Sequence, residues 1–186
     1  MIQLADLVAQ YRTIQVDIDR AIRSVLEDGR YIMGPNTKAL EREIAAYLGV
    51  EHGVGVASGT DALLLSLRAL GIGPGDEVIV PAYTFLATAS AVLHAGASPV
   101  LVDVEPDTYG IDLQAVAALV TRKTRAIIPV HLFGQPVDMA GLMDLAATHA
   151  ITVIEDNAQA LGATDRGRKT GSIGRVGCLS FFPSKN

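Results

Sequence analysis

Cysteine is almost absent from the sequence, because Cys178 is the only one in 186 residues. A single cysteine cannot form a disulfide within the chain, and this composition is typical of proteins in a reducing compartment. Cys178 lies in an apolar stretch, so we predict a packed thiol rather than a nucleophile. We accordingly expect a cytoplasmic protein.

Long hydrophobic runs and strong positive charge are also lacking. No apolar run approaches the roughly 18 residues that a membrane-spanning helix needs, and the first residues do not resemble a signal peptide. The formal net charge is −5 at pH 7, and the basic residues are scattered rather than gathered in the stripe of a nucleic-acid-binding protein. The longest basic run, Arg166–Lys169, is predicted to be a solvated loop. We expect neither a membrane nor a nucleic acid as partner.

Several signatures of other functions are missing. The sequence has no GxSxG elbow and no P-loop lysine motif. His52, His94 and His149 lack metal-ligand spacing, so no metal site is predicted. Gly53–Ser58 does not supply the GxGxxG fingerprint, which disfavours a Rossmann-type nucleotide-binding module.

Hydrophobic residues make up 49% of the chain and charged residues 19%, with 18 glycines, a composition typical of globular α/β proteins. Apolar periodicity predicts a helix over Val16–Asp28, ended by Gly29. A second helix is predicted with Asn36 as its N-cap and Gly49 at its end. We assign residues 1–52 to an N-terminal helical segment.

Beyond residue 52, short apolar runs alternate with helical stretches. The predicted strands are Gly53–Ala57, Glu77–Pro81, Pro99–Asp103, Arg125–Pro129, Thr152–Asp156 and Gly177–Phe182. The predicted helices are Asp61–Leu70, Leu86–Ala95, Asp112–Leu119 and Met139–Ala150. Strands that are apolar throughout indicate a sheet covered on both faces. The regular alternation predicts a three-layer α/β/α domain with a mostly parallel sheet over residues 53–186.

The segment Ser58–Asp61 joins a predicted strand to a predicted helix. Free N–H groups and the helix dipole favour an anion there, and Gly59 lets a phosphate approach the backbone closely. Thr60 adds a hydroxyl group. The alternative is that Ser58 or Thr60 only caps the helix.

Two acidic residues, Glu155 and Asp156, end another predicted strand. Ligands bind at this edge of open parallel sheets. A buried carboxylate there needs a cationic partner, or it becomes protonated. A protonated pyridine nitrogen would be such a partner, whereas the alternative is that Asp156 caps a following helix.

The end of the sequence contributes an amine. Lys185 follows an apolar strand, where partial desolvation favours the neutral form that can attack a carbonyl carbon. Ser180 could bind phosphate, Phe85 could offer a flat face to a cofactor ring, and His131 could contact a ligand. The alternatives are a surface lysine, a plain strand serine, a core phenylalanine and an ordinary hydrogen-bonded histidine.

Six motifs that include these residues occur in a fixed order along the chain. They are Ser58–Leu63, Gly73–Val78, Pro81–Phe85, His131–Gly134, Glu155–Gln159 and Ser180–Asn186. Together they resemble the DegT/DnrJ/EryC1/StrS family of sugar aminotransferases, which depend on pyridoxal 5′-phosphate (PLP) and have the aspartate aminotransferase (type I) fold.

The resemblance implies a role for each matching position. Lys185 would bind the cofactor covalently and shuttle the proton, and Asp156 would keep the pyridine nitrogen protonated so that the ring can accept electrons. The remaining contacts would be Gln159 near the phenolic oxygen, Gly59, Thr60 and Ser180 at the phosphate, and Phe85 on the ring face.

The implied reaction moves an amino group from glutamate to a nucleotide-linked keto-sugar, for polysaccharide or amino-sugar synthesis. Residues 53–186 would form most of the PLP-binding large domain. Members of the family continue beyond the lysine, add a C-terminal small domain and form homodimers, so we expect this sequence to be part of a longer protein. The alternative is a non-catalytic fragment that keeps only part of the ligand-binding fold.

Overall fold

The computed structural model describes residues 6–185, which divide into two compact units. The first, here called the N-terminal unit, runs to Gly55 and includes Phe182–Ser184. The second, called the sheet unit, runs from Val56 to Phe181 and includes Lys185. Each unit has its own set of internal contacts.

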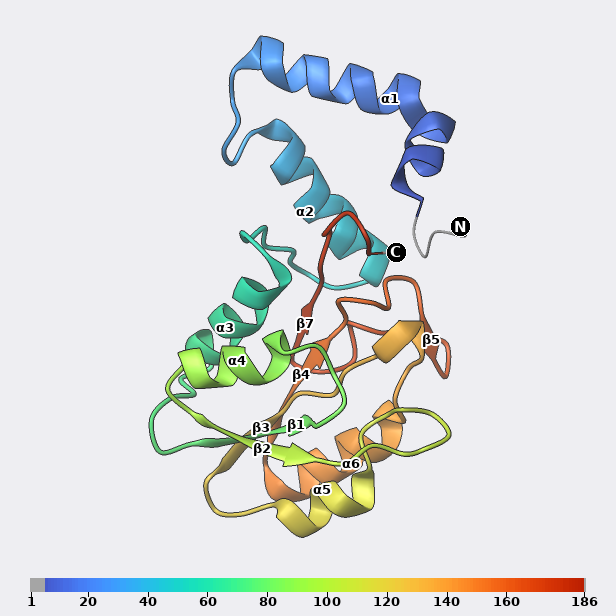
Figure 1. Ribbon diagram of the computed structural model, residues 1–186. Helices are drawn as coiled ribbons and strands as arrows, with labels where there is room; N and C mark the ends of the chain where they lie inside the picture. The colour runs from blue at the N-terminus through green and yellow to red at the C-terminus, as the bar shows by residue number, and fades with distance from the viewer. Residues whose placement is uncertain (1–5, 186) are drawn as a thin grey trace. The chain divides into compact units, whose positions relative to one another are not determined.

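Two helices make up most of the N-terminal unit, α1 (Leu7–Asp28) and α2 (Pro35–Leu48) (Figure 1). Helix α1 begins earlier than predicted, because the Asp6 side chain caps it by accepting a 2.9 Å hydrogen bond from the Ala9 N–H. Gly29 and Gly49 end the two helices in the left-handed conformation, as predicted.

The predicted N-cap of α2 is wrong by two residues. Gly34 is the N-cap and Pro35 is the first helical residue, so Asn36 lies inside the first turn. Proline is favoured at this position because its ring fixes a helical φ and because the first N–H of a helix has no partner to lose.

The sheet unit contains five parallel strands in the order β2-β1-β3-β4-β7. These strands are β1 (Glu77–Pro81), β2 (Ser98–Val102), β3 (Thr124–Ile127), β4 (Thr152–Asp156) and β7 (Val176–Cys178). The helices between them are α3 (Gly59–Ala69), α4 (Ala87–His94), α5 (Leu113–Leu119) and α6 (Met139–His149). Apart from β7, these elements lie within two residues of their predicted bounds.

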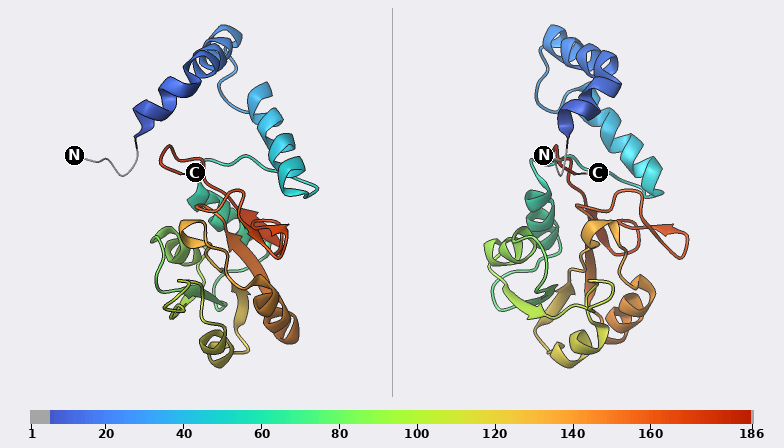
Figure 2. Two further views of the ribbon diagram at one scale, coloured as in Figure 1. Left: turned by 90° about the vertical axis from the view of Figure 1, so that its right-hand side faces the viewer. Right: turned by 45° about the vertical axis from the view of Figure 1, so that its right-hand side comes forward.

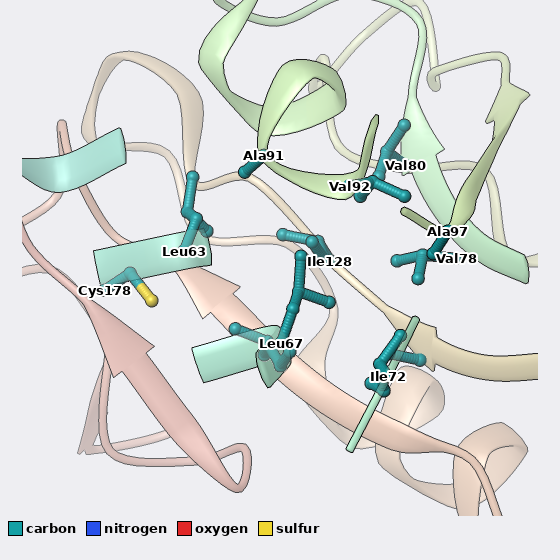
Figure 3. Packing of buried hydrophobic residues seen from close by; sticks show 12 residues of the cluster. Leu63, Leu67, Ile72, Val78, Val80, Ala91, Val92, Ala97, Ile128 and Cys178 are labelled. Carbon is teal, nitrogen blue, oxygen red and sulfur yellow. The ribbon is translucent and has the colours of Figure 1, made fainter. Parts of the chain in front are cut away.

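Helices cover both faces of this sheet, as the two views in Figure 2 show. Successive strand residues point to opposite faces, so Val78 and Val80 of β1 join the core cluster under α3 and α4, while Ile79 joins the cluster under α5 and α6. Figure 3 shows the first of these clusters. The predicted three-layer fold with a mostly parallel sheet is therefore confirmed.

The predicted strand Gly53–Ala57 does not form in the described chain. The Gly55 N–H donates instead to the Glu41 side chain at 2.7 Å, and a Cβ atom on Gly53 would collide with the Glu41 carbonyl oxygen. This backbone therefore runs against helix α2, where a side chain replaces a neighbouring strand as the hydrogen-bond partner.

Two further departures concern the last part of the sheet unit. Strand β7 ends at Cys178, so the predicted strand to Phe182 is too long. The basic run, predicted to be a loop, forms the turn and the second strand of a small hairpin that joins β5 (Thr164–Asp165) to β6 (Arg168–Lys169). Both turn residues, Arg166 and Gly167, have positive φ values, as tight two-residue hairpins require.

Cys178 is the packed thiol that the sequence predicts. It is 2% exposed, and burial raises the pKa of its thiol to about 12. A thiol with such a high pKa stays protonated and is a poor nucleophile at neutral pH. Among residues 6–185, no helix combines the length and the apolar character needed to cross a membrane.

Leucine-to-alanine changes in α3 should distinguish its buried face from its outer face. Leu67 is fully buried and Leu65 is 47% exposed. We expect Leu67→Ala to lower the free energy of unfolding by about 3 kcal/mol, because it removes buried methyl groups and leaves a cavity. The control Leu65→Ala should cost less than about 1 kcal/mol. Urea denaturation measures both, and equal losses would contradict the packing described here.

Candidate active site

The carboxyl ends of the parallel strands lie at one edge of the sheet, and the candidate residues follow them closely. Phe85 follows β1, Asp156 ends β4, and Ser180 follows β7. The chain leaves β1 through α4 on one face and leaves β2 through α5 on the other. A reversal of this kind creates the crevice in which doubly wound sheets bind ligands.

The start of helix α3, with Gly59, Thr60 and Ser180, is the predicted phosphate site and is here called the anion cradle. Ser58 caps the helix by accepting from the Asp61 N–H at 3.1 Å, so this capping role is confirmed. A Cβ atom on Gly59 would lie 3.0 Å from the Ser180 Cβ and 3.3 Å from the Leu179 carbonyl oxygen. Gly59 and Ser180 are therefore direct neighbours, and Thr60 lies on the same first turn.

Asp156 lies at the end of β4 and is only 6% exposed. Its Oδ2 accepts from the Thr88 hydroxyl at 2.9 Å, and its Oδ1 accepts from the Ala158 N–H at 3.2 Å. Burial raises the pKa of this carboxyl, opposed by those two hydrogen bonds and by the positive charge of Lys185. Residues 157–163 form turns, so the alternative in which Asp156 caps a helix is wrong.

Lys185 and Phe85 lie close together although 100 residues separate them in the sequence. The Lys185 Nζ is 5.9 Å from the centroid of the Phe85 ring, a distance typical of a cation–π contact. Phe85 is 69% exposed, so it does not fill the core. Since Lys185 also acts electrostatically on Asp156, the amine, the aromatic ring and the carboxylate share one region of the sheet unit.

Gln159 is oriented by the short 3₁₀ turn η1 (Leu132–Gly134). Its Oε1 accepts a 2.9 Å hydrogen bond from the Phe133 N–H, and Phe133 has a left-handed backbone conformation with φ 55°. This bond assigns the amide oxygen to the η1 side and fixes the side chain beyond the end of β4.

Glu155, the neighbour of Asp156, is a structural anchor. Glu155 and His131 are both fully buried, and Glu155 Oε2 lies 3.0 Å from His131 Nε2. The Glu155 carboxylate also accepts from three backbone N–H groups within 2.6–2.7 Å, those of Gly171, Ile173 and Gly174. Burial alone raises the pKa of Glu155, but these four hydrogen bonds outweigh it, and the net pKa is lowered.

His131 is the ordinary hydrogen-bonded histidine that we considered as the alternative to a ligand contact. Its Nδ1 accepts from the Val137 N–H at 3.3 Å, so that nitrogen carries no proton. We therefore assign the neutral form with the proton on Nε2, which donates to Glu155.

A cavity of about 450 Å³ lies at the ends of β1 and β2, and none of the candidate site residues lines it. Its walls include Tyr83 and Tyr109, whose ring centroids are 5.7 Å apart, together with Asp103, Val104 and Pro106. The buried carboxylate and the anion cradle lie elsewhere, so we place the candidate site with those groups and not in this cavity.

One residue near Asp156 was missed by sequence reasoning. Thr88 is fully buried and donates directly to the Asp156 carboxylate. A weak signal was present, because Thr88 is a polar residue on the buried face of a helix that is otherwise mostly apolar. Nothing in the sequence alone, however, joins that face to Asp156.

The sequence model of the DegT/DnrJ/EryC1/StrS aminotransferase family matches residues 12–186. The chain belongs to this family. It is 54% identical over 185 residues to UDP-N-acetyl-3-dehydro-α-D-glucosamine 3-aminotransferase of Acidithiobacillus ferrooxidans, a match that covers 100% of this chain and 50% of that protein. The chain thus spans about half the length of the curated relatives it matches.

Solved structures of the family have the same fold. S. venezuelae DesV in complex with a ketimine intermediate superposes with a TM-score of 0.96 at 47% identity, over 99% of this chain and 50% of DesV. The PLP form of the sugar aminotransferase Spr1654 from Streptococcus pneumoniae gives a TM-score of 0.83 at 37% identity, over 88% of this chain and 46% of that one. PLP is thus bound in at least one relative of the same fold.

Replacing the buried Glu155 tests its role as an anchor. Because the pKa of Glu155 is lower in the folded protein than in the unfolded chain, its stabilisation is present above the unfolded pKa, about 4.5, and is lost as the pH falls through the folded pKa. We expect Glu155→Gln to lower the free energy of unfolding by about 3 kcal/mol at pH 7. On acidification below pH 4.5, the variant should lose less of its free energy of unfolding than the wild type does.

The control for this experiment is Glu51→Gln, because the Glu51 side chain is 87% exposed. It should stay within about 0.5 kcal/mol of the wild type. Denaturant titrations at a series of pH values measure all three proteins. If the free energies of unfolding of the wild type and Glu155→Gln fell in parallel with pH, the Glu155 carboxylate would not act as a charged anchor.

Proposed function

We propose that the intact protein is a PLP-dependent aminotransferase that transfers the amino group of glutamate to a nucleotide-linked keto-sugar. The observation that carries this proposal is the buried Asp156 carboxylate at the end of β4, within electrostatic reach of the Lys185 amine. The anion cradle at Gly59 and Ser180 adds a place for a phosphate group. Family membership supports the same assignment.

The phosphate group of PLP fits the start of α3. Helix α3 has 11 residues, so its N-terminus carries the partial positive charge of a full helix dipole. The space beside Gly59 would be filled by any Cβ atom, which explains a glycine at this position. We propose that Gly59, Thr60 and Ser180 bind the phosphate group.

The pyridine nitrogen fits Asp156. Each carboxylate oxygen can accept about two hydrogen bonds, and Thr88 and Ala158 occupy one position on each oxygen. The remaining capacity suits the N–H of a protonated ring, and that positive charge would offset the cost of burying the carboxylate. The side chain of Gln159 is placed by Phe133, and we propose that it contacts the phenolic oxygen.

When bound, PLP supplies a reactive carbonyl carbon and a ring that accepts electrons. Lys185 Nζ would bind that carbon and, once released by the amino donor, would carry the proton that the donor loses. The Phe85 ring, close to Lys185 Nζ, would cover one face of the cofactor and limit the access of water. Asp156 would keep the ring nitrogen protonated throughout.

The relatives suggest the acceptor. The A. ferrooxidans relative is named for the 3-amination of a UDP-linked N-acetyl sugar, and we propose a nucleotide-linked keto-sugar of this class for the present protein. We also propose that the intact protein is a cytoplasmic homodimer, as the resemblance implies, and that the sheet unit belongs to its PLP-binding large domain.

Replacing Lys185 tests the covalent link to the cofactor. We expect the intact protein to show the visible absorption of lysine-bound PLP and Lys185→Ala to lack it, because the substitution removes the amine that would form the link. Borohydride reduction followed by peptide mapping should place the cofactor mass on Lys185. The control Lys123→Ala, at an exposed position, should keep both signals. A retained absorption in Lys185→Ala would refute the assignment of this lysine.

Filling the anion cradle should weaken cofactor binding without unfolding the protein. We expect Gly59→Ala to raise the dissociation constant of PLP at least tenfold, about 1.4 kcal/mol, because the new methyl group meets the Ser180 side chain. In the control Gly73→Ala the new methyl group makes only ordinary contact, 3.5 Å from the Ala95 carbonyl oxygen. Fluorescence titration with PLP measures both variants, and equal affinities would place the phosphate elsewhere.

A further inference from the structure

Two threonine hydroxyls form a chain that ends on the candidate cofactor carboxylate. The Thr84 and Thr88 Oγ1 atoms are 3.1 Å apart, and the Thr88 Oγ1 lies 2.9 Å from the Asp156 Oδ2. Thr88 is fully buried and Asp156 nearly so. The two threonines come from the turn before α4 and from its first turn, whereas Asp156 comes from β4. The chain therefore joins two elements that are far apart in the sequence.

The hydrogens of this chain have one favourable arrangement when Asp156 is ionised. A hydroxyl group has a single proton, and the Thr88 Oγ1 could give it to Asp156 at 2.9 Å or to the Phe85 carbonyl oxygen at 3.3 Å. The bond to the carboxylate is shorter and charge-assisted, so it is the stronger of the two. Thr88 then accepts from Thr84, and both hydroxyl dipoles point their positive ends toward Asp156.

We propose that Thr88, supported by Thr84, is a positioning residue that keeps the Asp156 carboxylate ionised and correctly oriented toward the pyridine nitrogen of the cofactor. This role rests on the proposed function, because it acts only through Asp156 and the bound ring.

The same turn also positions Phe85. The Thr88 N–H donates to the Phe85 carbonyl oxygen at 3.2 Å, and Thr84 directly precedes Phe85 in the sequence. One short segment therefore orients the carboxylate that would face the edge of the ring and the aromatic side chain that would cover its face. A substitution at Thr88 that leaves the helix intact should disturb the orientation of the Asp156 carboxylate more than that of the Phe85 ring.

Other titratable groups surround Asp156 and must be considered in a pH experiment. The charge of Lys185 favours the carboxylate, His131 lies nearby in hydrogen-bond contact with Glu155, Glu155 is the neighbour of Asp156 in β4, and the Cys178 thiol senses the charge of both acids. Threonine does not titrate, so its donor is present at every pH. Removal of the Thr88 hydroxyl should thus shift the titration midpoint of bound PLP without adding or removing a charged side chain.

The test compares Thr88→Val with Thr88→Ser in the intact, PLP-loaded protein. Valine keeps the volume and the branched shape but lacks the hydroxyl group, whereas serine keeps the hydroxyl. We expect Thr88→Val to raise, by about one unit, the pH at which the absorption of lysine-bound PLP is half changed. This estimate follows because a hydrogen bond to a charged group is strong enough to shift a pKa by about that amount. Without the Thr88 donor the Asp156 carboxylate is more basic, so it would take the proton of the ring nitrogen. The ring would then carry less positive charge, and the nitrogen that links PLP to Lys185 would hold its own proton up to a higher pH.

A second readout reports on the ring nitrogen directly. With ¹⁵N-labelled PLP, the nitrogen chemical shift should move toward the unprotonated value in Thr88→Val and remain near the wild-type value in Thr88→Ser. Thr84→Val, at a half-buried position, should shift both signals in the same direction by a smaller amount, and it carries the test if Thr88→Val does not fold. Thr148→Val, which removes an exposed hydroxyl bonded to the Asp144 carbonyl oxygen, should change neither signal.

The outcomes separate this inference from the proposed function. If the wild type shows no lysine-bound PLP, the proposed function fails, and this role fails with it. If the wild type binds PLP normally and folded Thr88→Val and Thr84→Val titrate as the wild type does, the threonine chain has no positioning role and the proposed function stands. If Thr88→Ser shifts as far as Thr88→Val, the effect comes from packing and the inference is also overturned.

Discussion

The buried carboxylate of Glu155 holds together the segments on which the candidate site is built. It binds the His131 imidazole and the backbone N–H groups of the loop that leads into β7. That loop precedes the segment with Ser180, His131 precedes the turn that orients Gln159, and Glu155 itself precedes Asp156. Because the backbone N–H groups of this loop donate to the Glu155 carboxylate, removal of that carboxylate would leave several buried N–H groups without an acceptor.

Glu155 and Asp156 show how one dipeptide can serve two different purposes. Both side chains are buried, yet the pKa of Glu155 is lowered and that of Asp156 is raised. The Glu155 carboxylate accepts four hydrogen bonds that outweigh the cost of burial, whereas the Asp156 carboxylate accepts two from side chains and backbone within residues 6–185. The first acid is thus fully satisfied by the protein, and the second still needs a cationic partner. A pyridinium ring is a partner of that kind.

Sequence patterns predicted most strands of the sheet well, because a buried strand appears in the sequence as a short run of apolar residues. The bounds predicted for β1 and β4 match the structure, since both are apolar runs with clear ends. The strand predicted at Gly53–Ala57 is wrong because its backbone bonds to the side chain of Glu41, a contact that no local pattern reveals. The separate roles of Glu155 and Asp156 and the contact made by Thr88 were equally hidden, because each depends on a partner distant in the sequence.

The charges along the sheet edge suit a ligand that carries both a negative and a positive group, such as PLP, better than a ligand that carries only one kind of charge. The helix α3 N-terminus and the space beside Gly59 favour an anion, whereas Asp156 favours a cation. PLP with a protonated ring carries a negative phosphate at one end and a positive nitrogen at the other, so in the proposed site each end would face a group of opposite charge. A simple phosphate ester would bring no positive charge to the buried Asp156 carboxylate, and an amine alone would bring no anion to the start of α3. A ligand that carries both charges, as PLP does, is therefore the one that our proposed function assigns to the sheet unit.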